Sequence, residues 1–134
     1  DTFADIGIEE NGKFHTLFEK GFAKEDDFPF KGGWLKNEQS FIEKIGLPLV
    51  KAITINKITD DKNLITQLRE KFDARVESME GAAFHYVCLQ KHINFFQLRS
   101  ISNTVGERDK SKWEMKEAIS ILNTELEKIV QNFI

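Results

Sequence analysis

The chain has 134 residues, of which 40% are hydrophobic and 31% charged, and its net charge is −3. This composition is typical of a globular protein with a single domain over residues 1–134. Lysines and arginines are interspersed with acidic residues and form no long basic run, which argues against a nucleic-acid binder. No apolar stretch approaches the roughly 20 residues that a membrane span needs. We therefore expect neither a nucleic-acid partner nor a membrane partner.

The cysteine and histidine residues bear on compartment and cofactors. Cys88 is the only cysteine, so no internal disulfide can form, and its apolar neighbours predict a buried thiol in a reducing, cytoplasmic compartment. The three histidines, His15, His85 and His92, have no Asp, Glu or Cys partners at metal-ligand spacing, and no glycine loop fits a phosphate cradle. We expect no cofactor and no metal.

The first part of the chain mixes strand and loop signals. Residues 2–9 are β-like and end in the turn signal Glu10-Asn11-Gly12. Residues 14–22 space their apolar side chains almost as a helix does, although a glycine interrupts the pattern. Residues 23–34 predict a loop whose aromatic side chains either anchor it to the surface or contact a partner subunit or a substrate. These aromatics are Phe28, Phe30 and Trp34.

Helix and strand signals alternate from there on. Residues 37–45 predict a short amphipathic helix that Gly46 and Pro48 end. Residues 49–55 are rich in β-branched side chains and predict a strand. A short strand is also expected at residues 74–76.

Two longer amphipathic helices are predicted. Asp60 or Asp61 can cap the first. Its inward positions are Leu64, Ile65, Leu68 and Phe72. The second covers about residues 111–133, and its mixed charges indicate packing on a sheet rather than on a membrane surface. Its apolar positions are Met115, Ala118, Ile119, Leu122, Leu126, Ile129, Val130 and Phe133.

The most informative stretch is residues 75–103, which read as the end of a strand, a helix, and then a strand over residues 95–101. The helix begins with Gly81-Ala82-Ala83, whose small side chains let its backbone lie close on a sheet. Strands that alternate with helices predict an α/β fold with parallel neighbours and right-handed crossovers. Polar residues follow both strands, and the carboxyl edge of a parallel sheet is where such folds bind ligands.

These residues also carry a resemblance. The block V-E-S-M-E-G-A-A, followed by R-S-I-S-N-T-V-G, resembles the C-terminal half of the purine nucleoside phosphorylase and nucleosidase superfamily. Ser102-Asn103 and the trailing G-E-R-D-K-S-K-W are most similar to its futalosine hydrolase branch. The resemblance implies a three-layer α/β/α fold with a mixed central sheet, of which this chain supplies the later strands. It also implies that an N-terminal portion is absent and that the protein is a homo-oligomer.

Glu80 is the first candidate catalytic residue. One carboxylate can accept hydrogen bonds from both hydroxyls of a ribose, and it stabilises the positive charge that builds on the sugar as an N-glycosidic bond breaks. The alternative is an acid in the first helical turn that the helix dipole favours; the resemblance favours the ribose role. By the same resemblance, Met79 forms an apolar wall under the ribose, although core packing is the alternative, and Glu77 holds the loop or the 3′ side of the sugar.

Asn103 is the second candidate. A purine leaves well only when N7 is protonated or hydrogen-bonded. The amide NH2 donates, and a 6-oxopurine presents N7 and O6 as acceptors on one edge, so Asn103 matches hypoxanthine and mismatches adenine. The alternative is a loop asparagine that makes its own turn contacts. Ser102 is expected to brace Asn103 or the loop.

Further substrate contacts follow from the resemblance. Trp113 matches an aromatic that closes over the bound nucleoside, although a surface tryptophan at the helix start is the alternative. Ile58 or Thr59 takes the place of a phenylalanine that stacks on the base in relatives, which leaves base stacking open. Arg108 or Lys110 is expected to meet the benzoate of futalosine, because a cation recognises a carboxylate.

Three functional hypotheses remain open on the sequence. The first is the C-terminal portion of a nucleosidase that acts on a 6-oxopurine nucleoside, most specifically futalosine. The second is an adenine-acting methylthioadenosine or adenosylhomocysteine nucleosidase, or a purine nucleoside phosphorylase. The third is a non-catalytic fragment that binds a nucleoside or mediates oligomerisation. The family places the water-activating acid in its N-terminal half, so we expect this chain alone to be inactive.

Overall fold

The computed structural model describes residues 1–133, with side chains described to Asn132, so the expected apolar contact of the Phe133 side chain lies outside the described part. Three short parallel strands form the central sheet in the order β1-β4-β5. They are β1 (Thr2–Phe3), β4 (Ala52–Thr54) and β5 (Val76–Ser78). Thr2 pairs with Ile53, and Ile53 pairs with Glu77. The parallel α/β arrangement expected from the sequence is thus confirmed.

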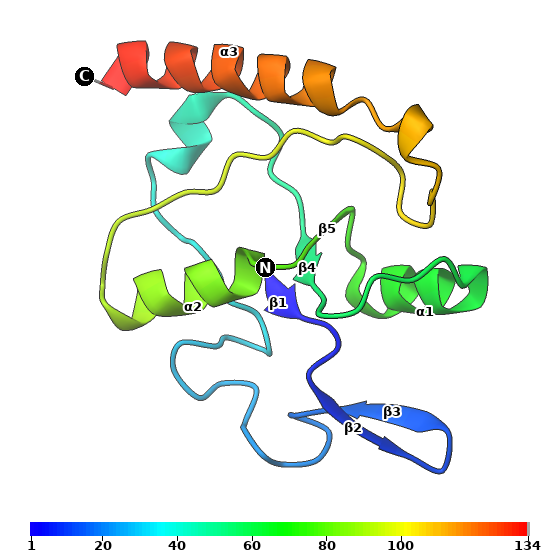
Figure 1. Ribbon diagram of the computed structural model, residues 1–134. Helices are drawn as coiled ribbons and strands as arrows, with labels where there is room; N and C mark the ends of the chain where they lie inside the picture. Colours follow the sequence, from blue (N-terminus) through cyan, green and yellow to red (C-terminus); the bar gives the residue numbers. More distant parts are fainter. Residues whose placement is uncertain (134) are drawn as a thin grey trace.

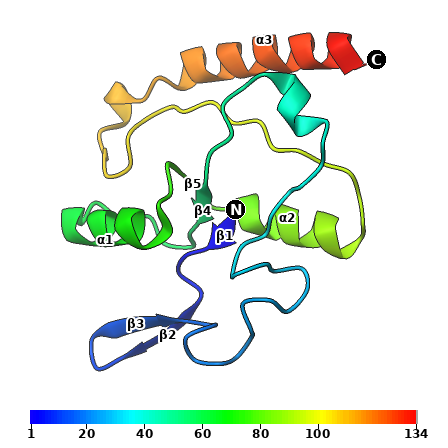
Figure 2. The same cartoon turned by 180° about the vertical axis from the view of Figure 1, so that it is seen from behind.

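Helices α1 (Lys62–Phe72) and α2 (Gly81–Gln90) flank the sheet (Figures 1 and 2). Ile53 of β4 and Ile55, just after it on the same face, pack with Leu68 and Phe72 of α1. Thr54 points the other way, and its Oγ1 accepts a hydrogen bond of 2.7 Å from the backbone N–H of Ala82 in α2. Because side chains alternate across a strand, β4 is covered on both faces, which gives the three-layer α/β/α order.

The start of α2 leaves no free space for a side chain at Gly81 unless neighbouring side chains shift. A Cβ at Gly81 would lie 1.9 Å from Arg99 Nη2 and 2.3 Å from Asp1 Oδ2. Gly81 and Ala82 are both buried, so the helix lies as close to the sheet as the Gly81-Ala82-Ala83 sequence predicts.

Helix α1 has the predicted N-terminal cap. The Asp61 side chain accepts from the backbone N–H groups of Asn63 and Leu64. Ile65, Leu68 and Phe72, spaced i, i+3 and i+7, are half-buried. Leu64 is 42% exposed, which corrects the prediction that it points inward. It lies about 100° around the helix from Ile65, at the margin of the buried face.

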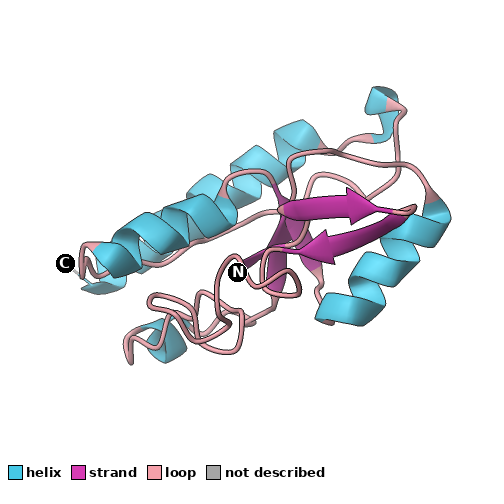
Figure 3. Ribbon diagram, turned by 90° about the horizontal axis from the view of Figure 1, so that it is seen from below, coloured by secondary structure: helices cyan, strands magenta, loops and turns pink. Residues whose placement is uncertain are grey.

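An antiparallel hairpin projects from the sheet, formed by β2 (Gly7–Glu10) and β3 (Lys13–Thr16) (Figure 3). Asn11 and Gly12 connect the strands with φ angles of 52° and 74°, the left-handed pair that a two-residue hairpin turn requires. The predicted turn is confirmed. The helical spacing of residues 14–22 was misleading, because β2 supplies ladder partners for residues 13–16 and turns follow.

Residues 95–101 do not form the predicted strand: among residues 1–133, no backbone ladder pairs with them. Side chains take the ladder's place at Phe95, whose N–H donates to Gln39 Oε1 at 3.1 Å and whose carbonyl accepts from Asn37 Nδ2. The helix predicted over residues 37–45 shrinks to the 3-10 turn η1 (Ile42–Ile45), and at its start the Asn37 side chain accepts from the backbone N–H of Gln39 at 3.2 Å, a local bond that competes with a helix. The strand expected at 49–55 is likewise shorter, since Leu49 and Val50 are exposed.

The last helix, α3 (Met115–Phe133), begins later than predicted, because a 3-10 turn, η2 (Lys110–Lys112), and an extended Trp113 precede it. Figures 1 and 2 show it beside the extended segment of residues 93–102 rather than on the three strands. The prediction that α3 packs directly on the sheet is therefore wrong, since this segment and η1 lie between them. Only two described α3 side chains, Ala118 and Ile129, are buried.

Candidate functional site

The carboxyl ends of β1, β4 and β5 meet at one edge of the sheet. Asp5 follows β1, Asn56 and Lys57 follow β4, and Met79 and Glu80 follow β5. The parallel order places these residues on the same edge, so the predicted position of Met79 and Glu80 holds, but Ser102 and Asn103 do not follow a strand because residues 95–101 form none.

Glu80 occupies the N-cap position of α2, with φ −120° and ψ −12°. Its carbonyl accepts from the N–H of Phe84 at 3.0 Å, while its carboxylate makes no capping bond. The side chain is exposed at the positive end of the helix, where an anion is favoured. The geometry therefore leaves the Glu80 carboxylate available to a ligand.

Met79 and Glu77 lie beside Glu80. Met79 is 48% exposed, so it is not a core residue in this chain. Glu77 is half-buried within β5, and burial, together with the nearby carboxylate of Asp5, raises its pKa. The carboxylates of Asp5, which follows β1, and of Glu77, within β5, thus interact electrostatically across the intervening strand β4.

Asn103 lies in the loop that precedes η2. Its Oδ1 accepts from the Ser102 hydroxyl at 2.7 Å, and its Nδ2 donates to the Thr104 carbonyl at 3.1 Å. The Ser102 carbonyl accepts from the N–H of Glu114 at 2.8 Å, which ties the loop to the start of α3. Ser102 therefore braces both Asn103 and the loop, and Asn103 makes the local contacts of the alternative interpretation.

The loop that carries Asn103 packs near the start of α1 and the segment that precedes it. A Cβ built on Gly106 would lie 2.9 Å from Ile65 Cδ1 and 4.0 Å from the Cα of Asp60. Ile58, in the same segment, is 50% exposed, and the Thr59 hydroxyl accepts from the N–H of Asp61 at 3.1 Å. Gly106, three residues after Asn103, thus lies near Asp60, the residue that follows Ile58 and Thr59 in the chain.

The structure does not join all the candidates. Within residues 1–133, no hydrogen bond links Glu80 to Asn103, and neither residue lines either of the two cavities described below. Trp113 is half-buried and its Nε1 donates to the Glu107 carbonyl at 3.0 Å. Arg108 and Lys110 are exposed on the same loop.

Sequence reasoning missed two charged residues at this end of the sheet. Asp5 accepts hydrogen bonds from Asn56 and Lys57. Arg99 Nη2 donates to Asp1 Oδ2 at 2.5 Å, while its buried Nη1 has no hydrogen-bond partner in the described part of the chain. Burial lowers the pKa of Arg99, and the charge of Glu80 opposes that shift. The signals were a polar residue directly after a strand and an arginine within an apolar segment.

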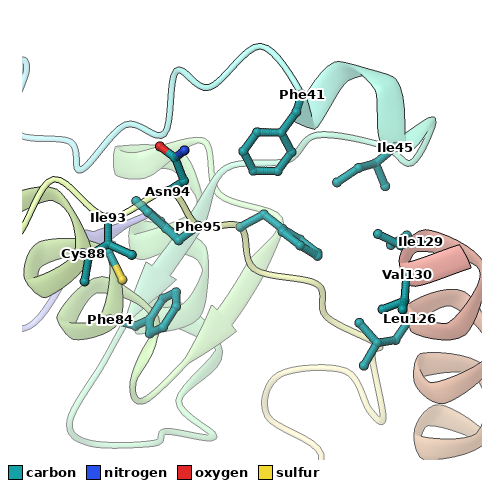
Figure 4. A pocket seen from close by; sticks show the side chains of 11 residues that line it. Phe41, Ile45, Phe84, Cys88, Ile93, Asn94, Phe95, Leu126, Ile129 and Val130 are labelled. Atoms are coloured by element: carbon teal, nitrogen blue, oxygen red, sulfur yellow. The ribbon is translucent and has the colours of Figure 1, made fainter. Parts of the chain in front are cut away.

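Two cavities lie away from the sheet edge. The first, about 580 Å³ in volume, is an apolar groove between η1, α2 and α3 (Figure 4). Phe41, Phe84, Phe95, Leu126 and Ile129 contribute to its lining. The second, about 500 Å³, is bounded in part by residues 28–31 and 36–39. Since neither contains the predicted catalytic pair, neither is assigned to the nucleoside.

Residues 1–133 contain neither a metal-binding cluster nor a membrane-spanning helix. The His, Cys, Asp and Glu side chains of this range form no group of three or more that could hold a metal ion. No helix in the same range has the length and apolar character of a membrane span. Cys88 is a free, buried thiol, as predicted.

Comparison with known proteins gives a family. Residues 5–134 match the model of the Phosphorylase superfamily. The futalosine hydrolase of Thermus thermophilus is 36% identical over 78 residues, covering 58% of this chain and 35% of that protein. The futalosine hydrolase of Streptomyces coelicolor is 26% identical over 129 residues, covering 96% of this chain and 53% of that protein. No solved structure gives a significant match. The chain spans about a third to a half of the length of these relatives, and it belongs to the Phosphorylase superfamily.

Proposed function

We propose that this chain is the C-terminal portion of a nucleosidase that hydrolyses the N-glycosidic bond of a 6-oxopurine nucleoside, with futalosine as its substrate and hypoxanthine as the released base. The observation that carries the proposal is the exposed Glu80 carboxylate, which stands beside Met79 at the carboxyl edge of a parallel sheet. The two relatives named futalosine hydrolase support the choice of substrate.

The Glu80 carboxylate binds the ribose. Its two oxygens accept from the 2′ and 3′ hydroxyls, and its charge stabilises the cationic sugar more in the transition state than in the ground state. Met79 lies under the ring as an apolar wall, and Glu77 supports the 3′ side of the sugar.

Asn103 binds the leaving base. Because its Oδ1 accepts from Ser102 and one N–H donates to the Thr104 carbonyl, the amide orientation leaves its second N–H to donate. That proton reaches N7 or O6 of hypoxanthine as negative charge flows into the ring. Ile58 and Thr59 form the side of the base pocket, and Trp113 closes over the nucleoside.

The deciding experiment incubates the intact protein with futalosine and measures free hypoxanthine by chromatography, with and without phosphate. We expect release that does not depend on phosphate, and a loss of about 100-fold or more in kcat/KM for Glu80→Gln. Release that requires phosphate identifies a phosphorylase, and release of adenine from methylthioadenosine identifies the adenine-acting branch. Binding without release identifies a non-catalytic module. We expect the 134-residue chain alone to release none.

Recognition of the benzoate is tested separately. Arg108 and Lys110 are exposed on the loop between Asn103 and α3. We predict that Arg108→Ala lowers the ratio of kcat/KM for futalosine to that for inosine about tenfold, because inosine has no carboxylate to lose. Lys110→Ala in parallel identifies which cation makes the contact. An unchanged ratio in both variants contradicts the assignment.

We also infer that the intact protein is a homo-oligomer. Phe28 is 60% exposed, and Phe30 and Trp34 are half-buried in the same loop. Light scattering coupled to size exclusion measures the oligomeric state, and a monomeric mass contradicts this inference.

A further inference from the structure

The Asp5 carboxylate holds the segment that leaves β4. Its Oδ2 accepts from the backbone N–H of Asn56 and, at 3.0 Å, from the backbone N–H of Lys57. Its Oδ1 accepts from the Asn56 side-chain amide at 2.9 Å. Both oxygens are therefore engaged by one short stretch of chain about 50 residues away in sequence.

The sheet fixes Asp5 in this position. Ala4, the preceding residue, is 1% exposed, and its N–H donates to the Thr54 carbonyl at 2.9 Å. Ile55, the residue before Asn56, is also 1% exposed, and its N–H donates to the Ser78 carbonyl at 2.9 Å. We call these three hydrogen bonds, from Asn56 and Lys57 to the Asp5 carboxylate, the Asp5 clamp. The residues on both of its sides are anchored in the buried sheet.

The clamp determines the path of residues 56–59. On the far side of this turn, Thr59 accepts from the N–H of Asp61, and Asp61 caps α1. The turn is held at both ends, and Ile58 between them is 50% exposed. Without Asp5, the N–H groups of Asn56 and Lys57 would bond to water, and the turn would be held at one end only.

The position of Asp5 carries an electrostatic cost. It faces Glu77, and the repulsion contributes, after burial, to the raised pKa of Glu77. An asparagine at position 5 would remove the repulsion, but it would also place an NH2 group against either the Asn56 amide or the two backbone donors. Only an ionised carboxylate accepts all three hydrogen bonds.

We propose that Asp5 is a positioning residue for purine binding, which clamps the Asn56–Lys57 backbone so that Ile58 and Thr59 form the side of the base pocket. This rests on the proposed function, because it takes residues 58 and 59 as that wall. The clamp acts on the base and not on the ribose, which Glu80 binds at the end of a different strand. Asp5→Asn therefore weakens the binding of every ligand that contains the base and leaves the binding of ligands without it unchanged.

The test measures two properties of Asp5→Asn in the intact protein. Amide hydrogen exchange at Asn56 and Lys57 should become about tenfold faster or more. The inhibition constant of hypoxanthine and the KM for futalosine should rise together by about tenfold, with kcat retained, because uniform binding is lost. Inhibition by free ribose should not change.

Two further variants separate a positioning role from a general loss of structure. Asp27→Asn is the matched control, because Asp27 Oδ2 accepts from the backbone N–H of Lys24 at 3.0 Å in a loop remote from the sheet edge. It should leave the KM unchanged. Asn56→Ala removes only the side-chain bond to Asp5 and should raise the KM by a smaller factor than Asp5→Asn does. It also keeps the test usable if Asp5→Asn does not fold.

Three results overturn the proposal. They are unchanged exchange at the two amides, faster exchange with an unchanged hypoxanthine constant, and an equal loss for hypoxanthine and ribose. An intact protein that neither binds hypoxanthine nor releases it from futalosine overturns the proposed function, and with it the role of Asp5. Normal turnover by the parent protein with any of the three results overturns the role of Asp5 alone.

Discussion

The carboxyl edge of the sheet and the groove beside α3 differ in how well their apolar side chains are buried. Behind the edge, all three residues of β4 and the following Ile55 are buried, with exposures of 7% or less. The segments that leave the strands are held because their backbone N–H groups donate to the side chains of Asp5 and Thr54. Along α3, in contrast, Ala118 and Ile129 are the buried side chains among those described, and large apolar residues remain exposed. These include Met115, Ile119, Leu126 and Val130.

The total surface reflects the same contrast. The chain exposes 9715 Å², whereas a folded monomer of 15.5 kDa exposes roughly 7,200 Å². The apolar residues of α3 and of the groove in Figure 4 contribute to the excess. The candidate site at the sheet edge and the exposed apolar face of α3 therefore depend on different interactions. Asp5, the turn at residues 56–59 and Glu80 are held within the sheet layer, so their geometry does not require α3 to be covered.

The largest expected effect comes from breaking the ion pair of Arg99 with Asp1. The Asp1 side chain is 1% exposed, so Arg99→Leu leaves a buried carboxylate without its partner. We predict a loss of about 3 kcal/mol or more in the free energy of unfolding, measured by urea denaturation. The matched control is Lys51→Met, which breaks an exposed pair with Asp73 and should cost less than about 0.5 kcal/mol. Equal losses in the two variants would contradict the expectation that the buried ion pair contributes more to stability than the exposed pair.

Truncating one apolar side chain in each region measures the contrast directly. Ile55 is 1% exposed in the core formed with Ala4 and Ile53, so Ile55→Ala should cost about 3 kcal/mol. Leu126 is 42% exposed on α3, so Leu126→Ala should cost less than about 1 kcal/mol. Denaturant midpoints of the two variants provide the measurement. A larger loss at Leu126 would mean that α3 is covered in solution.

A smaller effect depends on pH. His85 Nδ1 lies 3.0 Å from the Leu35 carbonyl, and burial lowers the pKa of the imidazole to about 4. Above its ordinary value of 6.5 the ring is neutral in both the folded and the unfolded state, so its contribution to stability is complete there. As the pH falls from 6.5 to about 4, the unfolded chain takes up a proton that the folded chain does not, and stability falls.

The variant His85→Asn isolates this term, because its side-chain NH2 can still donate to the Leu35 carbonyl without titrating. Denaturant midpoints across the same pH range should fall less steeply in the variant than in the parent. Parallel slopes would show that the buried imidazole does not cause the acid sensitivity.

The sequence predicted the features that local chemistry determines. The Asn11-Gly12 turn, the Asp61 cap and the close start of α2 at Gly81 each depend on a few neighbouring residues. The strand expected at residues 95–101 failed for the opposite reason. A strand needs a partner, and within residues 1–133 this segment has none, so Gln39 and Asn37 bond to Phe95 in its place.

In the candidate site, too, the sequence predicts residues placed by a local rule but not those placed by distant contacts. Glu80 and Met79 could be placed at the sheet edge, because the rule requires only that they follow a strand. The partners of Asp5 and of Arg99 could not be predicted, since their hydrogen bonds span 51 and 98 residues along the chain. Such contacts depend on the strand order β1-β4-β5, which places β4 between two strands that lie far apart in sequence.

The smallest predicted effect concerns Glu77, at the sheet edge. Burial, and then the Asp5 carboxylate, raises its pKa above the usual 4.5. The folded chain holds the Glu77 proton more tightly than the unfolded chain does, so this contribution to stability is complete below 4.5 and is lost as the pH rises through the raised value. Glu77→Gln should therefore raise the melting temperature slightly at neutral pH and leave it unchanged well below 4.5. In an Asp5→Asn background the gain at neutral pH should shrink, because one of its two causes is gone; an undiminished gain would mean that burial alone raises the pKa.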